Sequence, residues 1–543
     1  MENAVAMKRK DIFKAICLYS WKDVLFSGVL LLTAVSGAGL VLFITAQQGV
    51  LGLRDDSLGY LLIAQSFTGQ IQATSKAYVS YDSVTWSLTH FPPLFPWILT
   101  LWHNVSGQDF LSSGRWLYAC LFGLDMVIVG MILRRCLHSY MLAFLGVVWI
   151  FFSTDMLELY SVALSEALFI FFIFIWLGYF LDFLNNSKIT SFYISFFVIA
   201  LACMTRLAGF TLLVTSLAGL LVFKKKLTAV HVSIAVGLAT LPIMVWRIGS
   251  RTLGCDGFGW HRIDWNNFNI SPAFSVWPNK SAACFSGNTY WMLLAASIVF
   301  LGYRLWRYRN PQTTLEQFSA PARSLVAVSY IFIMVYVVGM VVVAGLLDPD
   351  ALPSERYLLP LHIFVVCVYL SFVDMLAGPF FIENFGLNDS SSRTRAVFIT
   401  LISVFIISQS ILVSGWASER RRQGTLLDGR YWAGSEIIQA VKQIPENSII
   451  YSNKAKAVYL LSGRICEMVD TPEQFEDPKM AGKMRQDFGG KKCYFVYCDP
   501  VPPGYSRVEY SALSLGEIRA RLSLKLWRRL SDGAIYVRDG SAP

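Results

Sequence analysis

The sequence predicts an all-α polytopic membrane domain followed by a small α/β domain. Of the 543 residues, 55% are hydrophobic and 15% are charged, whereas soluble domains carry about 25% charged residues. Apolar runs long enough to cross a bilayer recur along most of the chain. After residue 416 the composition changes, and helix-like stretches alternate with strand-like ones. The first two observations predict the membrane domain, and the third predicts the α/β domain.

The apolar runs predict about eleven transmembrane helices. The first run follows a basic N-terminal segment that has no clear small-residue cleavage site, so we interpret it as a retained helix and not as a signal peptide. In chain order the runs lie at 24–46, 111–133, 139–153, 159–182, 190–206, 208–223, 228–248, 289–303, 324–346, 357–377 and 396–415. The pattern predicts a multi-pass protein that has the lipid bilayer as its surroundings.

The basic residues predict the orientation of these helices. They cluster between the apolar runs, at 8–10, 134–135, 224–226, 304–309 and 393–395. With the N-terminus in the cytoplasm every cluster falls inside, as the positive-inside rule requires. The net charge of +10 is therefore spread over loops and not gathered on one soluble face, which argues against nucleic acid as a partner. We expect a bacterial plasma (inner) membrane protein with a cytoplasmic N-terminus.

An odd number of spans places the C-terminal region on the outer side. We expect residues 1–416 to form the transmembrane domain, with a first outer loop at 47–110, and residues 417–543 to form an extracytoplasmic domain. In that domain "SEIIQAVKQI" and "SLGEIRARLSLKLWRRL" have helix-like patterns, whereas "SIIYS", "CYFVYC" and "GAIYV" have strand-like ones. Their alternation predicts the α/β fold.

The first outer loop begins with two acidic residues, Asp55 and Asp56. Apolar residues then recur at near-helical spacing over 58–67, which predicts an amphipathic helix lying in the membrane interface. One interpretation is structural: Asp55 caps the helix and Asp56 favours its positive end. The other is that these carboxylates carry chemistry near the head groups, and the two interpretations are compatible.

Three further acidic residues face the same predicted side. Asp155 and Glu158 occupy the turn between the third and fourth spans, where they are either a solvated connection or a second acidic pair in the site. Glu166 lies about two turns further into an apolar helix. An ionisable group at that depth is costly and faces a cavity or a partner, so we take it as functional or pairing.

Cations that suit a phosphate occur at matching positions. Arg206 interrupts "ACMTRLAGF", Arg356 lies in "PSERYLLPL", His90 precedes two prolines, and His261 and Arg262 lie in the second outer loop. Arginine binds phosphate through its planar fork of donors. Each single arginine is also explained by snorkelling or by pairing with an acid, but their placement on the face that holds the acids favours a site.

Five motifs together resemble the GT-C superfamily of membrane glycosyltransferases. They are "RDDSLGYLLIAQSF", "HFPPLFPWIL", "LYSVALSEALF", "MTRLAGF" and "SERYLLPL". The pattern is most similar to the branch that holds the aminoarabinose transferases of lipid A and the protein O-mannosyltransferases. The resemblance implies a GT-C type fold and an enzyme that moves a sugar from a polyprenyl-phosphate donor to an extracytoplasmic acceptor, which is lipid A, a polysaccharide, a glycolipid or a protein.

The resemblance also implies roles for the residues that match these motifs. One aspartate of the first outer loop acts as the catalytic base, which corresponds to Asp55 or Asp56, and Asp55 aligns better with the start of the motif. A second acid after the third span corresponds to Asp155 or Glu158. We expect Arg206, Arg262, Arg356, His90, His261 and Glu166 to form the donor-binding part of the site, where arginines stabilise the charge on the leaving phosphate. Single displacement predicts inversion at the sugar.

One departure from the family pattern concerns the substrate. Where the aminoarabinose transferases place an acid and a lysine before the proline, this sequence has Thr89 and His90. A neutral histidine binds phosphate less strongly than lysine does. No metal-ligand spacing occurs, so we predict no metal site and no definite cofactor, and leave a divalent metal open. The predicted number of spans is also lower than in those relatives.

A rival interpretation is a transporter or flippase for lipid-linked saccharides, with Glu166 and Arg206 on its pathway. Such carriers often consist of paired halves with broken helices, which this sequence does not show. A non-catalytic membrane scaffold is a second rival. Formation of a glycosylated product by the purified protein separates the three.

Overall fold

The structure is a computed structural model, and the parts of the chain that it describes contain most of the expected helices. The described residues are 21–46, 49–69, 91–252, 319–346, 355–385, 392–424, 434–468, 493–498 and 524–538. The predictions for His90, His261 and Arg262, and the expected span at 289–303, lie outside these residues.

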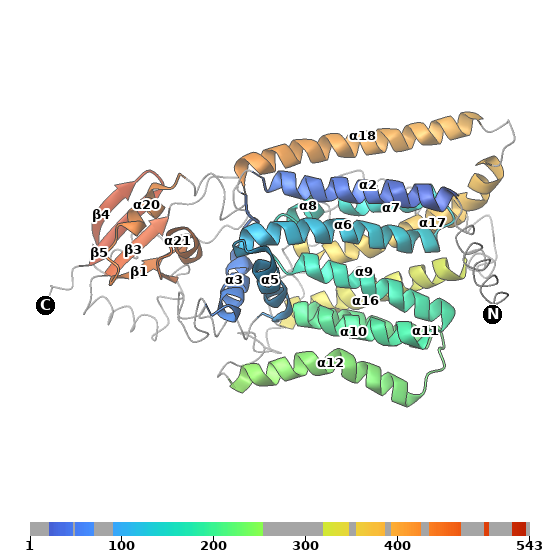
Figure 1. Cartoon of the computed structure of the whole chain (residues 1–543), viewed down its shortest axis with the longest axis horizontal. Coiled ribbons are helices and arrows are strands. Elements are labelled where there is room, and N and C mark those ends of the chain that lie inside the picture. The colour runs from blue at the N-terminus through green and yellow to red at the C-terminus, as the bar shows by residue number, and fades with distance from the viewer. Residues whose placement is uncertain are drawn as a thin grey trace, which may run out of the picture.

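The first described region is a bundle of long helices that lie side by side (Figure 1). Lipid offers no hydrogen bonds to a backbone, so apolar segments satisfy their peptide groups within helices. The helices are α2 (Trp21–Ile44), α6 (Phe110–Cys136), α7 (Tyr140–Phe151), α9 (Glu166–Asn186), α10 (Ile189–Thr205), α11 (Phe210–Val222), α12 (Ala229–Thr252), α16 (Ala320–Leu346), α17 (Leu359–Phe385) and α18 (Ser392–Gln423). Each expected span within the described residues overlaps one of them, and the span at 159–182 does so only in part.

Five helices in the described part are long and apolar enough to cross a membrane: α2, α6, α9, α12 and α16. Four shorter apolar segments accompany them, at Tyr140–Phe151, Ile189–Thr205, Leu207–Val222 and Leu359–Asp374. The predicted helical architecture is therefore confirmed for the described residues, and the total of eleven spans stays a prediction.

One expected span is interrupted. The sequence predicts a helix over 159–182, but the structure has a short helix, α8 (Thr154–Leu159), then a non-helical segment, and α9 begins at Glu166. The expectation that Glu166 lies two turns inside a helix is therefore wrong. Residues 160–165 instead make backbone and side-chain hydrogen bonds to other parts of the chain, which are described below. These bonds compete with helical pairing. Glu166 consequently lies at the end of the bundle.

Small residues allow close packing between α2 and α6. A Cβ atom on Gly37 would lie 2.7 Å from Met126 Sδ and from Phe122 Cε1, and one on Gly130 would lie 2.7 Å from the methyl groups of Leu30. Such close approach gives dispersion contacts where the hydrophobic effect is absent. These contacts fix the first helix to the centre of the bundle.

Two short helices, α3 (Asp55–Phe67) and α5 (Leu94–Ser106), lie at the end of the bundle that faces the C-terminal domain (Figure 1). The prediction of a helix after Asp55 is confirmed, but α3 does not bury a single face, because every residue from 57 to 64 is buried. Arg54 and not Asp55 is the N-cap residue, so the structural interpretation of Asp55 as a cap is wrong.

The C-terminal region contains a five-stranded sheet in the order β2-β1-β3-β5-β4. β1 is parallel to β2 and β3, whereas β5 is antiparallel to β3 and β4. The elements are α20 (Glu436–Lys442), β1 (Ile449–Ser452), α21 (Ala455–Ser462), β2 (Glu467–Met468), β3 (Cys493–Cys498), β4 (Lys525–Leu530) and β5 (Gly533–Arg538). The mixed α/β composition matches the sequence prediction, while the division at 416/417 stays a prediction.

One element of this domain differs from its sequence pattern. The stretch 514–530 has a helix-like pattern, but Lys525–Leu530 is strand β4, which pairs with β5 at the edge of the sheet. Leu, Lys and Arg favour helices locally, yet pairing with β5 supplies backbone hydrogen bonds, and the charged side chains suit an exposed edge. Tertiary pairing therefore overrides the local preference.

Candidate active site

The site begins with a contact between two segments that the sequence separates widely. Gly52, just before α3, forms a parallel bridge with Val162, between α8 and α9. The Gly52 N–H donates to the Ser161 carbonyl at 2.8 Å, and the Ala163 N–H donates to the Gly52 carbonyl at 2.9 Å. This bridge fixes the start of α3 beside the start of α9, and it brings the acids of both helices together.

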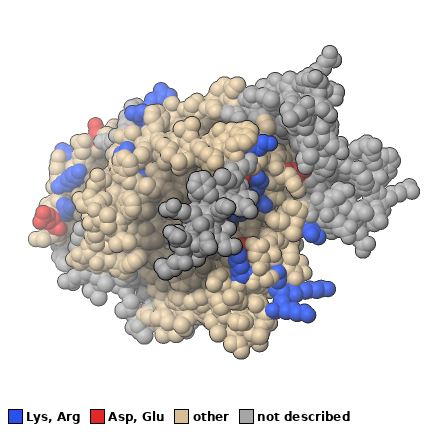
Figure 2. Space-filling model, turned by 45° about the vertical axis from the view of Figure 1, so that its right-hand side comes forward, with Lys and Arg blue, Asp and Glu red and all other residues tan. Residues whose placement is uncertain are grey.

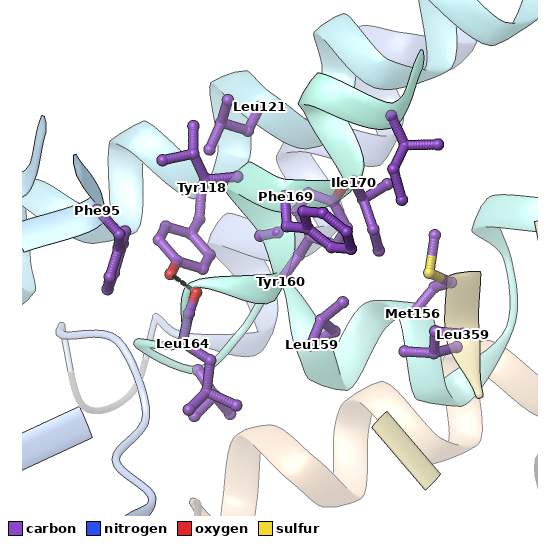
Figure 3. Close-up of a cluster of buried hydrophobic side chains, with 14 of the residues drawn as sticks. Phe95, Tyr118, Leu121, Met156, Leu159, Tyr160, Leu164, Phe169, Ile170 and Leu359 are labelled. Carbon is purple, nitrogen blue, oxygen red and sulfur yellow. Dashed lines mark hydrogen bonds between the residues drawn. The ribbon is translucent and has the colours of Figure 1, made fainter. Parts of the chain in front are cut away.

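Buried tyrosines hold the 160–165 segment in this position. The Tyr118 hydroxyl of α6 donates to the Leu164 carbonyl, and Figure 3 shows it pointing at that oxygen from within an apolar cluster. The Tyr160 hydroxyl donates to Asp125 Oδ2 in the middle of α6. The segment is thus tied to the bundle at both of its ends, which explains why it does not continue as a helix.

Four charged side chains from four elements form an ion-pair cluster, which we call the Asp56–Arg356 cluster. Arg356 Nη2 lies 2.7 Å from Asp56 Oδ2, and Arg356 Nε lies 3.6 Å from Glu166 Oε1. Arg206 Nη1 lies 2.8 Å from the same Glu166 oxygen. Glu166 is only 6% exposed and Arg206 and Arg356 are 17% and 18% exposed, so these charges interact in a poorly hydrated environment.

Glu166 is held by charge and not by hydrogen bonds. Among the described residues neither of its carboxylate oxygens has a hydrogen-bond partner, although Arg206 and Arg356 lie within ion-pair distance. We regard the contacts as ion pairs with poor donor alignment. A buried carboxylate without hydrogen bonds is unfavourable, so the two guanidinium charges are what stabilises Glu166 here.

Hydroxyl groups surround the cluster. Tyr60 Oη lies 2.7 Å from Ser165 Oγ, and Arg206 Nη1 donates to the same Ser165 oxygen at 3.0 Å. Arg356 Nη2 donates to the Tyr357 hydroxyl at 3.1 Å. The Arg206 and Arg356 guanidinium carbons lie 5.6 Å and 5.0 Å from the centre of the Tyr357 ring. The site therefore offers guanidinium and hydroxyl donors side by side.

Electrostatics keep these donors protonated. Burial acts to lower the pKa of Arg356, but Asp56 and Glu166 outweigh it and the pKa is raised. Burial also raises the pKa of Tyr60 above its usual value of 10.0. An acid with a raised pKa stays neutral to higher pH, so the Tyr60 hydroxyl remains a proton donor throughout the physiological range.

Glu158 belongs to a different cluster. Its Oε1 atom contacts the guanidinium of Arg54, and Arg420 Nη2 lies 3.0 Å from it. Asp155 lies in the first turn of the same short helix, α8. Both residues stay predicted members of the site, but Glu158 is engaged by two arginines that the sequence analysis did not connect with it.

The structure thus brings together Asp56, Glu166, Arg206 and Arg356 from the predicted set. Asp55 is the first residue of α3, and its side chain is outside the described part. Within the described residues no group of three or more His, Cys, Asp or Glu side chains is placed to hold a metal ion, and a divalent metal stays open.

The sequence analysis missed Tyr60, Ser165 and Tyr357. Each has a signal in the chain: Ser165 and Tyr357 directly adjoin Glu166 and Arg356, and Tyr60 lies one helical turn after Asp56. Hydroxyl residues beside an ionisable residue in an apolar segment are therefore useful markers, although their partners are visible only in the fold.

No family model matches the sequence, and no curated protein matches it. The fold, however, is similar to solved structures. ArnT from Cupriavidus metallidurans bound to undecaprenyl phosphate superimposes with a TM-score of 0.55 at 13% identity, covering 94% of this chain and 98% of that one. Apo ArnT gives a TM-score of 0.54 at 12% identity, covering 95% and 98%.

The oligosaccharyltransferase from Archaeoglobus fulgidus, in its apo form, gives a TM-score of 0.55 at 12% identity and covers 88% of this chain and 70% of that one. ArnT, an aminoarabinose transferase, and this oligosaccharyltransferase are both GT-C enzymes. The fold that the sequence resemblance implied is therefore confirmed, since this chain has the fold of these solved structures.

Proposed function

We propose that this protein is an inverting glycosyltransferase that moves a sugar from a polyprenyl-phosphate carrier to an extracytoplasmic acceptor. The observation that carries the proposal is the Asp56–Arg356 cluster, which lies at one end of a GT-C type bundle. The solved ArnT structure with the same fold contains undecaprenyl phosphate, which supports a carrier of this chemical class. Lipid A, polysaccharides, glycolipids and proteins remain the candidate acceptors.

Arg206 and Arg356 are the proposed phosphate ligands. Each presents N–H groups next to a hydroxyl, and charge-assisted hydrogen bonds of this kind are strong in a poorly hydrated site. As the sugar leaves, the phosphate changes from a singly charged diester to a more highly charged monoester. Fixed cations aimed at that developing charge are what lowers the barrier.

The charges of the site favour an exchange of partners. Before the donor binds, Asp56 and Glu166 balance Arg206 and Arg356. When the base takes the proton of the acceptor hydroxyl or amine, one negative charge disappears from the protein as another appears on the phosphate. The total charge of the site is then unchanged during the displacement.

Asp55 is the proposed base and Asp56 the partner of Arg356. A neighbouring guanidinium favours the ionised form of a carboxylate and so weakens it as a proton acceptor. Asp56 has such a neighbour at 2.7 Å, which makes it better suited to orient Arg356. Asp55 would deprotonate the acceptor, which attacks the anomeric carbon opposite the phosphate and inverts it.

Single substitutions test this division of roles in purified protein supplied with a polyprenyl-phosphate sugar and a candidate acceptor. We expect Asp55→Asn to lower kcat by about 10²–10⁴-fold without weakening donor binding. Asp56→Asn removes the carboxylate that competes with phosphate for Arg356, so it should bind polyprenyl phosphate more tightly than the wild type does. Inhibition by added polyprenyl phosphate measures that affinity.

Asp109→Asn is the matched control, because Asp109 caps the start of α6 through the N–H groups of Leu111 and Ser112, and asparagine caps equally well. Full activity in Asp55→Asn contradicts its role as the base. Movement of the lipid-linked sugar across liposomes without any glycosylated product would favour the flippase interpretation instead.

A further inference from the structure

A second, partly buried ion-pair cluster, outside the Asp56–Arg356 cluster, joins three elements that are far apart in the chain. Glu158 of α8 lies between Arg54, the residue before α3, and Arg420, in the last turn of α18. The sequence separations are 104 and 262 residues. The three side chains are only 20–28% exposed, so their attraction is less weakened by water than that of a surface ion pair. We call them the Arg54–Glu158–Arg420 cluster.

The end of α18 is fixed on two sides. Arg420 contacts Glu158 in the bundle, while the guanidinium of Arg421 lies 4.4 Å from the centre of the Phe43 ring at the end of α2. Cations in the last turn also suit the negative end of the helix dipole. Among the described elements, α18 is the last one before the C-terminal domain (Figure 1), so this contact fixes the part of the bundle that comes before that domain in the chain.

The start of α3 is fixed by the same cluster. Arg54 is the N-cap residue, its N–H donates to Ser57 Oγ at 2.9 Å, and the Ser57 N–H donates to the Arg54 carbonyl at 3.0 Å. The backbone of Arg54 is therefore held by its own helix and its side chain by Glu158. Asp55 and Asp56 follow directly, so the position of Arg54 sets where the first turn of α3 places them.

We propose that Glu158 and Arg420 are positioning residues, which fix the first turn of α3, and with it the proposed base, through Arg54. This inference rests on the proposed function for its effect on catalysis. The structural part of the inference, that Arg420 restrains the start of α3, does not depend on the proposed function. Glu158 then acts through Arg54 and does not touch the reacting atoms, which differs from the catalytic role that the family resemblance implies for this position.

Kinetics of Arg420→Gln test the proposal. A displacement of the base by about 1 Å lowers turnover by about 10²-fold, so we expect kcat to fall by one to two orders of magnitude (about 10–10²-fold). The KM for the donor should not rise, because Arg206 and Arg356 bind the phosphate and are unchanged, and a displaced Asp56 competes less for Arg356. Arg420→Lys keeps the charge and should restore most of kcat. Glu158→Gln combined with Arg420→Gln should be no slower than Glu158→Gln alone, because both act through one cluster.

Arg422→Gln is the matched control: Arg422 lies two residues further along α18, and its partner is Glu419 on the exposed surface, at 2.7 Å. It should leave both kcat and KM unchanged. The proposal is overturned if Arg420→Gln has the wild-type kcat. It is also overturned if Arg420→Gln lowers kcat and raises the donor KM by similar factors. Loss in Glu158→Gln with full activity in Arg420→Gln would instead make Glu158 catalytic.

Hydrogen exchange separates this inference from the proposed function. The amides in the first turn of α3 should exchange faster in Arg420→Gln than in the wild type or in Arg422→Gln, whatever reaction the protein catalyses. Unchanged exchange there overturns the positioning role. If the wild type forms no product, the proposed glycosyltransferase activity fails, while the exchange result still decides whether Arg420 holds α3.

Discussion

At the scale of single residues, the main feature is that the cations of the site are already neutralised. Arg356 lies between Asp56 and Glu166, and Glu166 also attracts Arg206. In the proposed reaction, a phosphate therefore meets no excess positive charge on these four side chains and has to exchange with a carboxylate. We expect such a site to bind weakly enough to release its product and still to hold donors in place for the charge that develops during transfer.

Substitution of Arg356 tests this arrangement. Arg356→Gln removes an ion-pair partner of both Asp56 and Glu166, and it removes the guanidinium donors of Arg356 from the proposed phosphate site. We expect kcat to fall by about 10²–10³-fold, with a smaller loss in Arg356→Lys, which keeps the charge but not the planar fork. Initial rates of sugar transfer measure both.

The control for this prediction is Arg115→Gln. Arg115 lies in the second turn of α6, where its guanidinium carbon is 5.8 Å from the centre of the Trp116 ring. It should transfer sugar at the wild-type rate. Equal losses in Arg115→Gln and Arg356→Gln would mean that the loss reflects general damage to the protein.

At the scale of elements, the interruption between α8 and α9 decides the position of the site. A continuous helix would bury Glu166 two turns within the bundle, whereas the observed break makes it the first residue of α9. An acidic side chain is favourable at the positive end of a helix dipole. A second irregular segment, the turn η1 (Leu207–Gly209), follows α10. Arg206 directly precedes this turn and lies opposite Glu166.

Gly209 makes that turn possible. A Cβ atom there would lie 2.5 Å from the backbone nitrogen of Cys203 and 2.7 Å from the carbonyl carbon of Ala202. Gly209→Ala must therefore move the backbone beside Arg206, and we expect a loss of about 1–3 kcal/mol in stability, as for other overpacked sites. Polyprenyl phosphate should also bind more weakly. Thermal unfolding in detergent and ligand competition measure the two effects.

Gly237→Ala provides the comparison. Gly237 lies within α12, and a Cβ atom there meets nothing within 4 Å. Alanine is the better helix former by about 1 kcal/mol, so this variant should be as stable as the wild type or slightly more stable. If Gly209→Ala behaved like Gly237→Ala, the close contact would not constrain the turn.

At the scale of the whole molecule, two of the basic clusters that the sequence places in the cytoplasm lie at one end of the bundle, and the candidate site lies at the other. The C-terminal ends of α6 and α11, next to the basic residues 134–135 and 224–226, lie at the end away from α3 and the C-terminal domain (Figure 1). Figure 2 shows Lys and Arg in separate groups around a broad uncharged surface. The position of the clusters at 134–135 and 224–226 agrees with the predicted orientation, in which both are cytoplasmic.

Cysteine labelling tests that orientation. Glu446 in the C-terminal domain and Lys226 after α11 are both exposed. In intact cells with a permeable outer membrane, a membrane-impermeant maleimide should label Glu446→Cys and leave Lys226→Cys unlabelled until the membrane is lysed. The wild type provides the background from native cysteines. The reverse pattern would place the site on the cytoplasmic side and contradict an extracytoplasmic acceptor.

The sequence by itself determined where the helices lie and which charges matter. Apolar runs predict helices because a lipid-embedded backbone has no other way to pair its polar groups. Asp56, Glu166, Arg206 and Arg356 were identifiable because a charge next to an apolar segment is costly and is kept near a partner or a cavity. These are local properties, which a linear pattern contains.

Only the tertiary structure decided which charges pair and where helices stop. Glu158 lies with Arg54 and Arg420, and Asp56 lies with Arg356, across hundreds of residues of chain. The break before Glu166 depends on Tyr118, which is distant in sequence, and strand β4 depends on pairing with β5. Hydrogen bonds and ion pairs form between groups that the fold brings within a few ångströms, and no periodicity along the chain encodes that proximity.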